Sequence, residues 1–125
     1  MEEQRNIYTI YHNKELGNVR ITDDVIATIA GVAATDVEGV ASLLGGITRE
    51  LILKTGVKKL AKSVNAKIVD EEVVVNISIN LDYGYSIIEI SKDVQDKIKM
   101  QIEGMTGLTV AAVNVKVASV NVPNE

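Results

Sequence analysis

The fold of this chain is decided by a largely apolar stretch with a glycine near its end, Val25-Ile-Ala-Thr-Ile-Ala-Gly-Val-Ala-Ala-Thr-Asp-Val-Glu-Gly-Val-Ala-Ser-Leu43. Apolar residues recur at helical spacing before Gly39, and a short strand-like run follows it. Glycine adopts positive φ at little cost, so Gly39 can turn the chain from a helix into a strand. We therefore predict a helix, a glycine turn and a strand in this order.

The same order returns near the C-terminus, where residues 94–105 lead into Thr106-Gly-Leu-Thr-Val110. Aligning Gly107 on Gly39 brings the apolar positions of the two stretches into register. The pairs are Ile26 with Val94, Ala30 with Ile98, Ala34 with Ile102, Val37 with Met105, and Val40 with Leu108. Two ordinary amphipathic helices with glycine stops would match equally well, so the alignment places elements and does not show a duplication.

Capping signals mark where helices begin. Thr22 is a suitable N-cap for a helix over residues 23–35, and the two aspartates that follow it place negative charge at the positive end of the helix dipole. Ser86 with Glu89 forms a capping-box pattern for a helix over residues 87–103. A third helical pattern, weakened by a glycine, covers residues 47–62 and has its apolar positions at Leu53, Val57, Leu60 and Ala61.

Alternating apolar residues predict a sheet with one buried face. In the strand over residues 72–82, Val73, Val75, Ile77, Ile79 and Leu81 point one way, and Val74, Asn76, Ser78, Asn80 and Asp82 point the other. In the last strand, residues 108–122, the apolar parity switches twice, which predicts bulges near Ala111-Ala112 and Ala118-Ser119. Shorter strands are predicted at 7–11 and 18–21 around a turn at 12–17, at 39–44 before Gly45-Gly46, and at 67–69 before a hairpin turn at Asp70-Glu71.

These patterns predict one domain over residues 1–125 of the α/β (α+β) class. It has two layers, with helices at 23–35 and 87–103 packed on one face of a mixed sheet. A chain of 125 residues that is 46% hydrophobic can bury a core without disulfides or metals.

Composition excludes several classes of function. The chain has no Cys, so disulfides, thiolate metal sites and thiol nucleophiles are excluded. It has no Trp or Phe, and its four tyrosines form no evident stacking platform for single-stranded nucleic acid. A formal charge of −4 argues against bulk attraction to phosphate backbones. Because the first residues lack a secretory signal and no apolar run reaches the ~20 residues of a membrane span, we expect a cytoplasmic protein with no transmembrane segment of its own.

Five sequence blocks in a fixed order resemble a known family. They are Gly17-x-Val-x-Ile-Thr-Asp-Asp-Val-Ile-x-x-Ile-Ala-Gly-Val-Ala, Val37-Glu-Gly-Val, Leu81-Asp-Tyr-Gly, Met105-Thr-Gly-Leu-Thr-Val and Val113-Asn-Val-Lys-Val. Over about residues 17–120 the chain resembles the alkaline-shock-protein (Gls-type) family of Gram-positive bacteria. It departs from the family at Ile88, where proline is usual, and over residues 45–65, which match no family block.

The resemblance implies a small α/β protein of envelope stress homeostasis that has no catalytic activity, self-associates and, in some members, lies beneath the membrane through a membrane-embedded partner. We therefore expect a noncatalytic scaffold or adaptor and a homo-oligomer. A membrane-anchored protein partner would recruit it from the cytoplasm to the inner face of the cell membrane.

An RNA-binding module of KH-like topology is the alternative function. Gly104-Met-Thr-Gly107 has the spelling of the loop with which KH domains clamp nucleic-acid backbone, and the predicted element order from residue 47 onward is partly KH-like. The tetrapeptide, however, joins a helix to a strand and contains no lysine or arginine. A helix stop explains it better, so nucleic acid is not the expected partner.

No residue pattern indicates an enzyme, a metal site or a cofactor. His12, the only histidine, falls in a predicted polar turn without a second ligand. Asp70, Glu71 and Glu72 would diverge at a hairpin tip and lack the opposed geometry of an acid–base pair. Gly45-Gly46 lacks the lysine and serine of a Walker loop.

Two surfaces are candidates for partner contacts. One is a basic segment, in which Arg49, Lys54, Lys58, Lys59 and Lys62 against Glu50 give a charge of +4; it suits an acidic protein, anionic headgroups or an ordinary solvated face. The other is the polar face of the sheet, which is nearly uncharged and therefore easier to desolvate. It would contain Asn76, Ser78 and Asn80, with Asn114 and Lys116 if the last strand is their neighbour; Gly39, Gly84 and Gly107 are expected to matter as structural turns.

Two expectations follow for assembly. Self-association should use the surface or the edge of the sheet, because the last strand is long, aliphatic and protected only by Lys116 and Pro123. Membrane attachment should use a protein anchor, since Glu2 stands where myristoylation needs glycine and there is no cysteine to lipidate.

Overall fold

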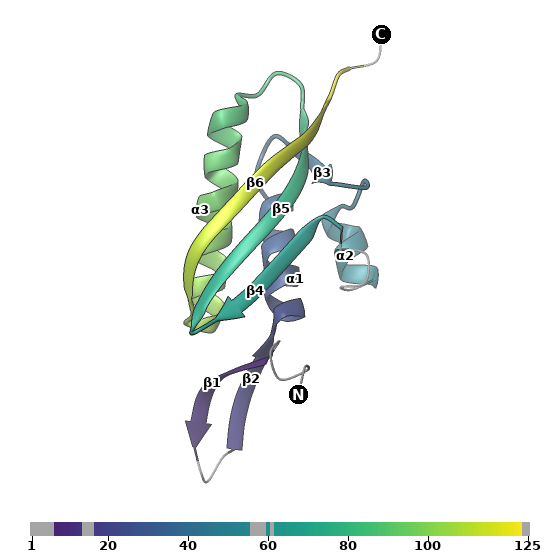
Figure 1. Cartoon of the computed structure of the whole chain (residues 1–125). Coiled ribbons are helices and arrows are strands. Elements are labelled where there is room, and N and C mark those ends of the chain that lie inside the picture. Colours follow the sequence, from purple (N-terminus) through teal and green to yellow (C-terminus); the bar gives the residue numbers. More distant parts are fainter. Residues whose placement is uncertain (1–6, 14–16, 56–59, 61, 124–125) are drawn as a thin grey trace.

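The computed structural model describes residues 7–13, 17–55, 60 and 62–123. The elements in chain order are β1 (Ile7–Asn13), β2 (Gly17–Thr22), α1 (Asp23–Thr35), β3 (Val40–Leu43), α2 (Arg49–Thr55), β4 (Val64–Val69), β5 (Glu72–Asp82), α3 (Ile87–Thr106) and β6 (Thr109–Asn121). Helices α1 and α3 lie together behind a sheet of β3, β4, β5 and β6, whereas β1 and β2 pair with each other apart from it (Figure 1). The predicted two-layer α+β fold is confirmed.

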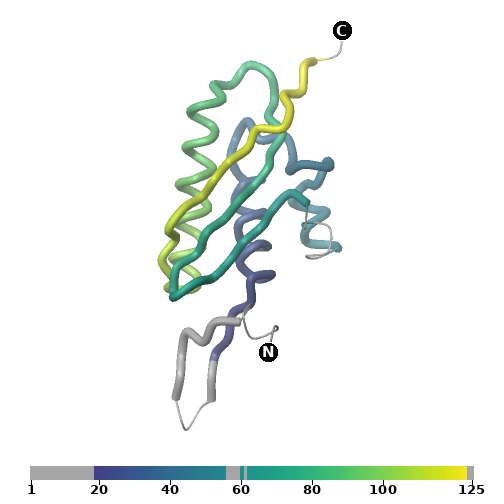
Figure 2. Tube along the Cα trace, viewed as in Figure 1, coloured from purple at the N-terminus to yellow at the C-terminus, as the bar shows by residue number. Residues whose placement is uncertain are grey.

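Strand β5 is the centre of the sheet. On one side it pairs in parallel with β6 along its whole length. On the other side it pairs antiparallel with β4 over its first half and with β3 over its second half. Figure 2 shows the chain rising along β5, descending along α3 and rising again along β6, which is why β5 and β6 are parallel. The sheet is therefore mixed, as predicted.

Both predicted bulges are present in β6. The register with β5 slips by one residue at Ala111, between the pairs Val73 with Val110 and Val74 with Ala112. It slips again at Ala118, between Ile79 with Val117 and Asn80 with Ser119. After each slip, the apolar side chains again point to the buried face of the sheet. The positions at which the apolar alternation of the sequence changes therefore predict the bulges.

The predicted caps begin α1 and α3. The Thr22 hydroxyl accepts a hydrogen bond from the Val25 N–H at 3.3 Å, and the Ser86 hydroxyl accepts one from the Glu89 N–H at 3.3 Å. Helix α3 continues to Thr106, three residues beyond the predicted end. It ends at Gly107, whose left-handed conformation (φ 77°) lets its N–H donate to the Glu103 carbonyl.

The core is formed by the apolar stripes of α1 and α3, which the sequence analysis aligned, and by the face of β5 that these helices cover. Ile26, Ala30, Ala34, Val94, Ile98 and Ile102 have no exposed surface. The pair of Val37 with Met105 departs from the alignment, since Met105 is 66% exposed. The buried stripe of α3 continues from Ile102 in a step of four to Thr106, which turns Met105 toward solvent.

The predicted helix over residues 47–62 is wrong in extent and in its buried face. Ile47 forms a bridge with Leu43, so α2 begins only at Arg49, and it ends at Thr55. Ile52 is buried at 2% exposure and Leu53 is 66% exposed, the reverse of the prediction for Leu53. The prediction that Leu60 is buried is confirmed, at 1% exposure, while Val57 and Ala61 lie outside the described residues.

Several strand boundaries also differ from the predictions. His12 belongs to β1, opposite Asn18, because the β1–β2 ladder continues as far as Asn13 with Gly17. β4 begins at Val64, three residues earlier than predicted, and β6 ends at Asn121. The hairpin turn between β4 and β5 is confirmed at Asp70 and Glu71, which both adopt positive φ.

Candidate interaction surface

One face of the sheet is not covered by a helix, because α1 and α3 both lie on the other face (Figure 1). On this open face, side chains from β4, β5 and β6 alternate with buried ones. Between Glu72 and Asp82 of β5, the outward positions of these three strands hold no carboxylate. We name them the open face: Asn65, Lys67, Val74, Asn76, Ser78, Asn80, Ala112, Asn114, Lys116 and Ser119.

The polar side chains of the open face form ordered rows across the strands. In one row Asn65, Asn76 and Asn114 are neighbours, and the Asn114 amide donates to the Asn76 Oδ1 at 2.9 Å. Another row centres on Asn80. Because β6 is the direct neighbour of β5, the structure brings together the five polar residues that the sequence analysis assigned to this face.

Asn80 joins three strands. Its amide donates to the Ser42 Oγ at 3.1 Å and to the Leu43 carbonyl at 3.2 Å, both in β3. Its Oδ1 accepts from the Ser119 hydroxyl of β6 at 2.8 Å. These three bonds fix the side chain before any partner arrives, so little rotamer freedom is left for binding to remove.

A depression of about 280 Å³ opens on this face. Lys62 and Lys116 contribute to its lining together with Asn65, Ser78 and Asn114, and none of its lining residues is acidic. The depression thus brings the end of the basic segment to the polar sheet face. Its amides, hydroxyl and ammonium groups suit carbonyl or carboxylate oxygens of a partner.

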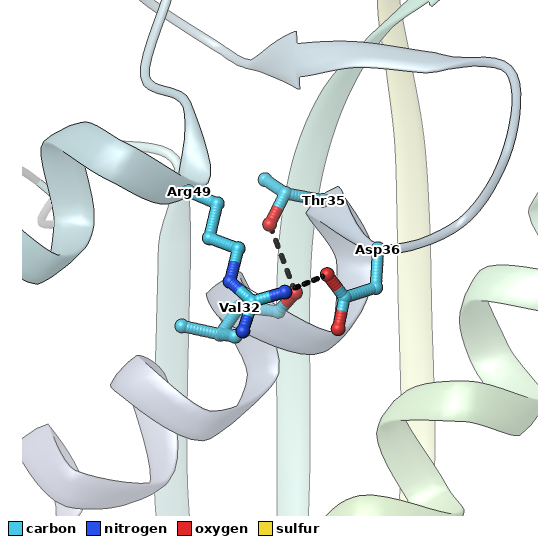
Figure 3. Close-up of polar contacts among 4 residues, drawn as sticks. All are labelled: Val32, Thr35, Asp36 and Arg49. Atoms are coloured by element: carbon cyan, nitrogen blue, oxygen red, sulfur yellow. Dashed lines mark hydrogen bonds and ion pairs between the residues drawn. The ribbon is translucent and has the colours of Figure 1, made fainter.

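Arg49 and Lys54 belong to α2, so these two residues of the basic segment do not lie on the strands of the open face. Arg49 begins α2 and donates to the Asp36 carboxylate at 2.7 Å, beside the Thr35 hydroxyl, which donates to the Val32 carbonyl (Figure 3). This pair neutralises Arg49 and ties α2 to the end of α1. Lys54 is exposed in the last turn of α2, and Lys58 and Lys59 lie outside the described residues.

Gly39 is the structural glycine with the tightest surroundings. It has φ of 99°, and a Cβ at this position would lie 2.8 Å from Ile90 Cδ1 and 3.0 Å from the ring of Tyr85. The Tyr85 hydroxyl donates to the Glu38 carboxylate at 3.1 Å, which raises the pKa of the phenol. Gly84 and Gly107 also have positive φ but have open space around them.

Among the described residues, the pKa of Asp23 is raised as well as that of Tyr85. Burial raises the pKa of Asp23, and the Ile68 N–H, which donates to its Oδ1 at 3.2 Å, opposes that shift. This bond ties the start of α1 to the edge of β4. Within the part of the chain that the structure describes, no group of three or more His, Cys, Asp or Glu side chains could hold a metal ion, and no helix is both long and apolar enough to cross a membrane.

The segment from Gly104 to Gly107 is the end of a helix. Gly104, Met105 and Thr106 belong to the last turn of α3, and Gly107 is its C-terminal cap. The Thr106 hydroxyl donates to the Ile102 carbonyl at 2.6 Å and accepts from the Leu108 N–H at 3.1 Å. These contacts account for the tetrapeptide as a helix stop.

Sequence reasoning missed Asn65 and Ser119 on the open face, and it missed Ser42, the β3 residue that Asn80 contacts. Asn65 carried a usable signal, because it alternates with the apolar residues Val64 and Ala66. The position of Ser42 depends on β3 being a neighbour of β5, and the position of Ser119 depends on the bulge at Ala118. No local sequence pattern shows which strands flank β5, so Ser42 could not have been assigned from the sequence.

Comparison with known proteins gives the chain its family. The sequence profile of the Asp23 family, described as having a cell envelope-related function, matches residues 11–122. The Streptococcus pyogenes protein Spy1614 is 33% identical over 123 residues, which are 94% of this chain and 98% of that protein. YloU of Bacillus subtilis is 31% identical over 114 residues, 86% of this chain and 92% of that protein.

A more distant relative and a set of solved structures also resemble the chain. A homologue of the stress response regulator Gls24 from Streptococcus pyogenes is 28% identical over 105 residues, 83% of this chain and 59% of that protein. Among solved structures, a MamM CTD variant is 13% identical over 75% of this chain and 90% of its own, with a TM-score of 0.46, which is too low to carry an inference. From the profile match and the relatives that align over most of its length, the chain belongs to the Asp23 family of alkaline shock proteins.

Proposed function

We propose that this protein is a noncatalytic scaffold of cell-envelope stress homeostasis, which self-associates and is recruited to the inner face of the membrane by a membrane-anchored protein. Membership of a family with a cell envelope-related function supports the setting. The observation that carries the scaffold role is the open face, a sheet surface that none of the described helices covers and on which Asn76, Asn114, Asn80 and Ser119 are already hydrogen-bonded to one another in pairs.

The open face suits an interface between copies. Burying charged groups is costly unless they are paired, and this face presents mainly neutral amides, hydroxyls and small apolar side chains. Asn76, Asn80 and Asn114 have partners before association, so fewer side chains must be ordered when a second copy binds. Its two lysines, Lys67 and Lys116, lie in different rows, which leaves the row of asparagines uncharged.

The distribution of charge supports recruitment through a protein. Residues 49–62 carry +4, and the rest of the chain carries −8. A single cationic segment adsorbs to anionic lipid weakly and is screened by salt, and here the remaining acids oppose it. A protein anchor supplies the affinity that this charge pattern lacks.

Sedimentation velocity of the full chain tests self-association through the open face. We expect oligomers at micromolar concentration, and we expect Ser78→Arg or Asn114→Arg to shift them to the monomer, because each adds an unpaired cation to the buried surface. Met100→Arg is the matched control, since it adds the same charge on the exposed side of α3. A strict monomer at high micromolar concentration, or open-face variants that sediment like the control, would show that this face does not assemble.

Flotation with anionic liposomes at physiological salt tests recruitment. The purified chain should remain unbound, while in cells its membrane localisation should depend on the anchor protein. Tight, salt-resistant binding to bare liposomes would show that the basic segment is itself the anchor.

A further inference from the structure

We propose that the outer edge of β6 binds an extended, acidic segment of another protein, which adds to the sheet as a further strand. The inference rests on the proposed function, since it gives the chemistry of a protein partner, but it uses a different surface from the open face. β6 is the last strand on its side of the sheet, with β5 on one side of it and α3 behind it (Figure 1).

Side chains of α3 occupy two backbone groups in the first half of this edge. The Glu103 carboxylate accepts from the Val110 N–H at 2.9 Å, and the Gln95 side chain donates to the Val113 carbonyl at 3.0 Å. Both bonds use backbone groups that point away from β5. In this half, the Glu103 and Gln95 side chains therefore stand where another strand would have to pair.

The second half of the edge is open. Backbone groups alternate in direction along a strand, so Val115 and Val117 present their N–H and C=O groups on the same side as Val113. The bulge at Ala118 shifts this alternation by one residue, to Val120. None of the described residues forms a hydrogen bond to these outward groups. Unpaired groups of this kind are the template for β-strand addition.

Apolar side chains lie beside the open half. Val115, Val117 and Val120 are only partly buried, and they pack against the core on the side of the helices. Ile88 is 70% exposed and lies two helical turns before Gln95, on the same side of α3. Every second side chain of an added strand would cover these four residues. A strand with apolar residues at every second position therefore suits this edge best.

Charge complementarity makes that strand acidic. Lys116 lies on the open face next to the edge, and the open face holds no carboxylate between Glu72 and Asp82 of β5. Side chains at the intervening positions of an added strand point to the open face, because successive side chains of a strand alternate between the two faces. Carboxylates at these positions would therefore lie next to Lys116.

A second copy of β6 does not fit this edge. The part of the open edge without a bulge runs from Val115 to Val117. If the same stretch of a second copy paired with it antiparallel, the two-fold axis between the copies would pass beside Lys116. Two lysines would then be directly opposed, which destabilises strand pairing. Lys116 thus disfavours self-pairing and favours a partner that carries a carboxylate.

A labelled peptide in which valine and glutamate alternate is the probe, and its binding to the full chain is measured by fluorescence anisotropy. We expect it to bind at least about tenfold more tightly than the same peptide with lysine in place of glutamate, or with alternate amides N-methylated. Val117→Pro should weaken binding by about tenfold, because it removes an outward N–H, and proline is tolerated where an edge N–H faces solvent. Val117→Ala keeps that N–H and is the matched control.

Three results would overturn the proposal. The first is that the glutamate peptide does not bind. The second is that the N-methylated peptide binds as tightly as the unmodified one. Both measurements use the wild-type chain, so they do not depend on whether a variant folds. The third is loss of self-association in Val117→Pro, which would make a second copy the occupant. Asn65→Arg separates this proposal from the proposed function: it adds a cation to the open face on β4, which β5 separates from β6, so it should abolish self-association and leave peptide binding unchanged. Lys116→Glu should reverse the preference between the glutamate and lysine peptides.

Discussion

Gly39 shows how one residue can constrain the whole helix-to-strand turn. Gly39→Ala should lower the free energy of unfolding by about 1–2 kcal/mol through the positive φ alone, and by a further 1–3 kcal/mol through the contacts with Ile90 and Tyr85. Urea unfolding measures the loss. Gly45→Ala is the control, because Gly45 has a similar φ of 88° but no atom within 4 Å of the added Cβ. Equal losses in the two variants would contradict the packing argument.

Tyr85 gives the same turn a dependence on pH. Its phenol donates to Glu38, so its pKa in the folded state lies above the ordinary value of 10.0. The hydrogen bond stabilises the fold below that value and is lost as the pH rises through the raised pKa. The advantage of the wild type over Tyr85→Phe in urea unfolding should therefore be constant near neutral pH and disappear in strong alkali. Tyr83→Phe removes the hydroxyl of another exposed tyrosine and is the control. An advantage over Tyr85→Phe that persists unchanged into strong alkali would contradict this prediction.

At the scale of elements, Asn80 is the side chain that connects most strands. Asn80→Ala removes bonds to Ser42, Leu43 and Ser119 and should cost about 1–3 kcal/mol. Asn76→Ala removes one exposed bond, to Asn114, and should cost about 0.5–1 kcal/mol. Hydrogen exchange should show faster opening of β3 in the first variant only. Unchanged exchange in β3 would mean that its backbone pairing with β5 is sufficient.

Elements whose signals are local could be predicted from the sequence. The caps at Thr22 and Ser86, the alternation in β5 and the parity switches in β6 depend on neighbours along the chain, and each is present in the structure. The face of α2 could not be predicted, because it depends on the bridge between Leu43 and Ile47. The pairing of β3 and β4 with the same side of β5 also depends on residues far apart in the chain, which is why Ser42 was missed.

At the scale of the whole molecule, β1 and β2 form a unit apart from the main sheet. They pair with each other, while the strands of the main sheet all pair with β5. Native-state hydrogen exchange should show the β1–β2 amides opening well below the free energy of global unfolding, and the β5 amides opening only with it. Protection of β1 and β2 equal to that of β5 would show that the two sheets unfold as one.

The parallel pairing of β5 with β6 has a mechanical consequence. β2 and the end of β6 lie at opposite ends of the molecule (Figure 1). A tension applied between these two points pulls β6 lengthwise against β5, so the evenly spaced bonds of the ladder are sheared together instead of being unzipped one after another. A protein that is held at both ends would then yield first at the small β1–β2 pair, and the sheet that carries the proposed binding surfaces would keep its shape under strain.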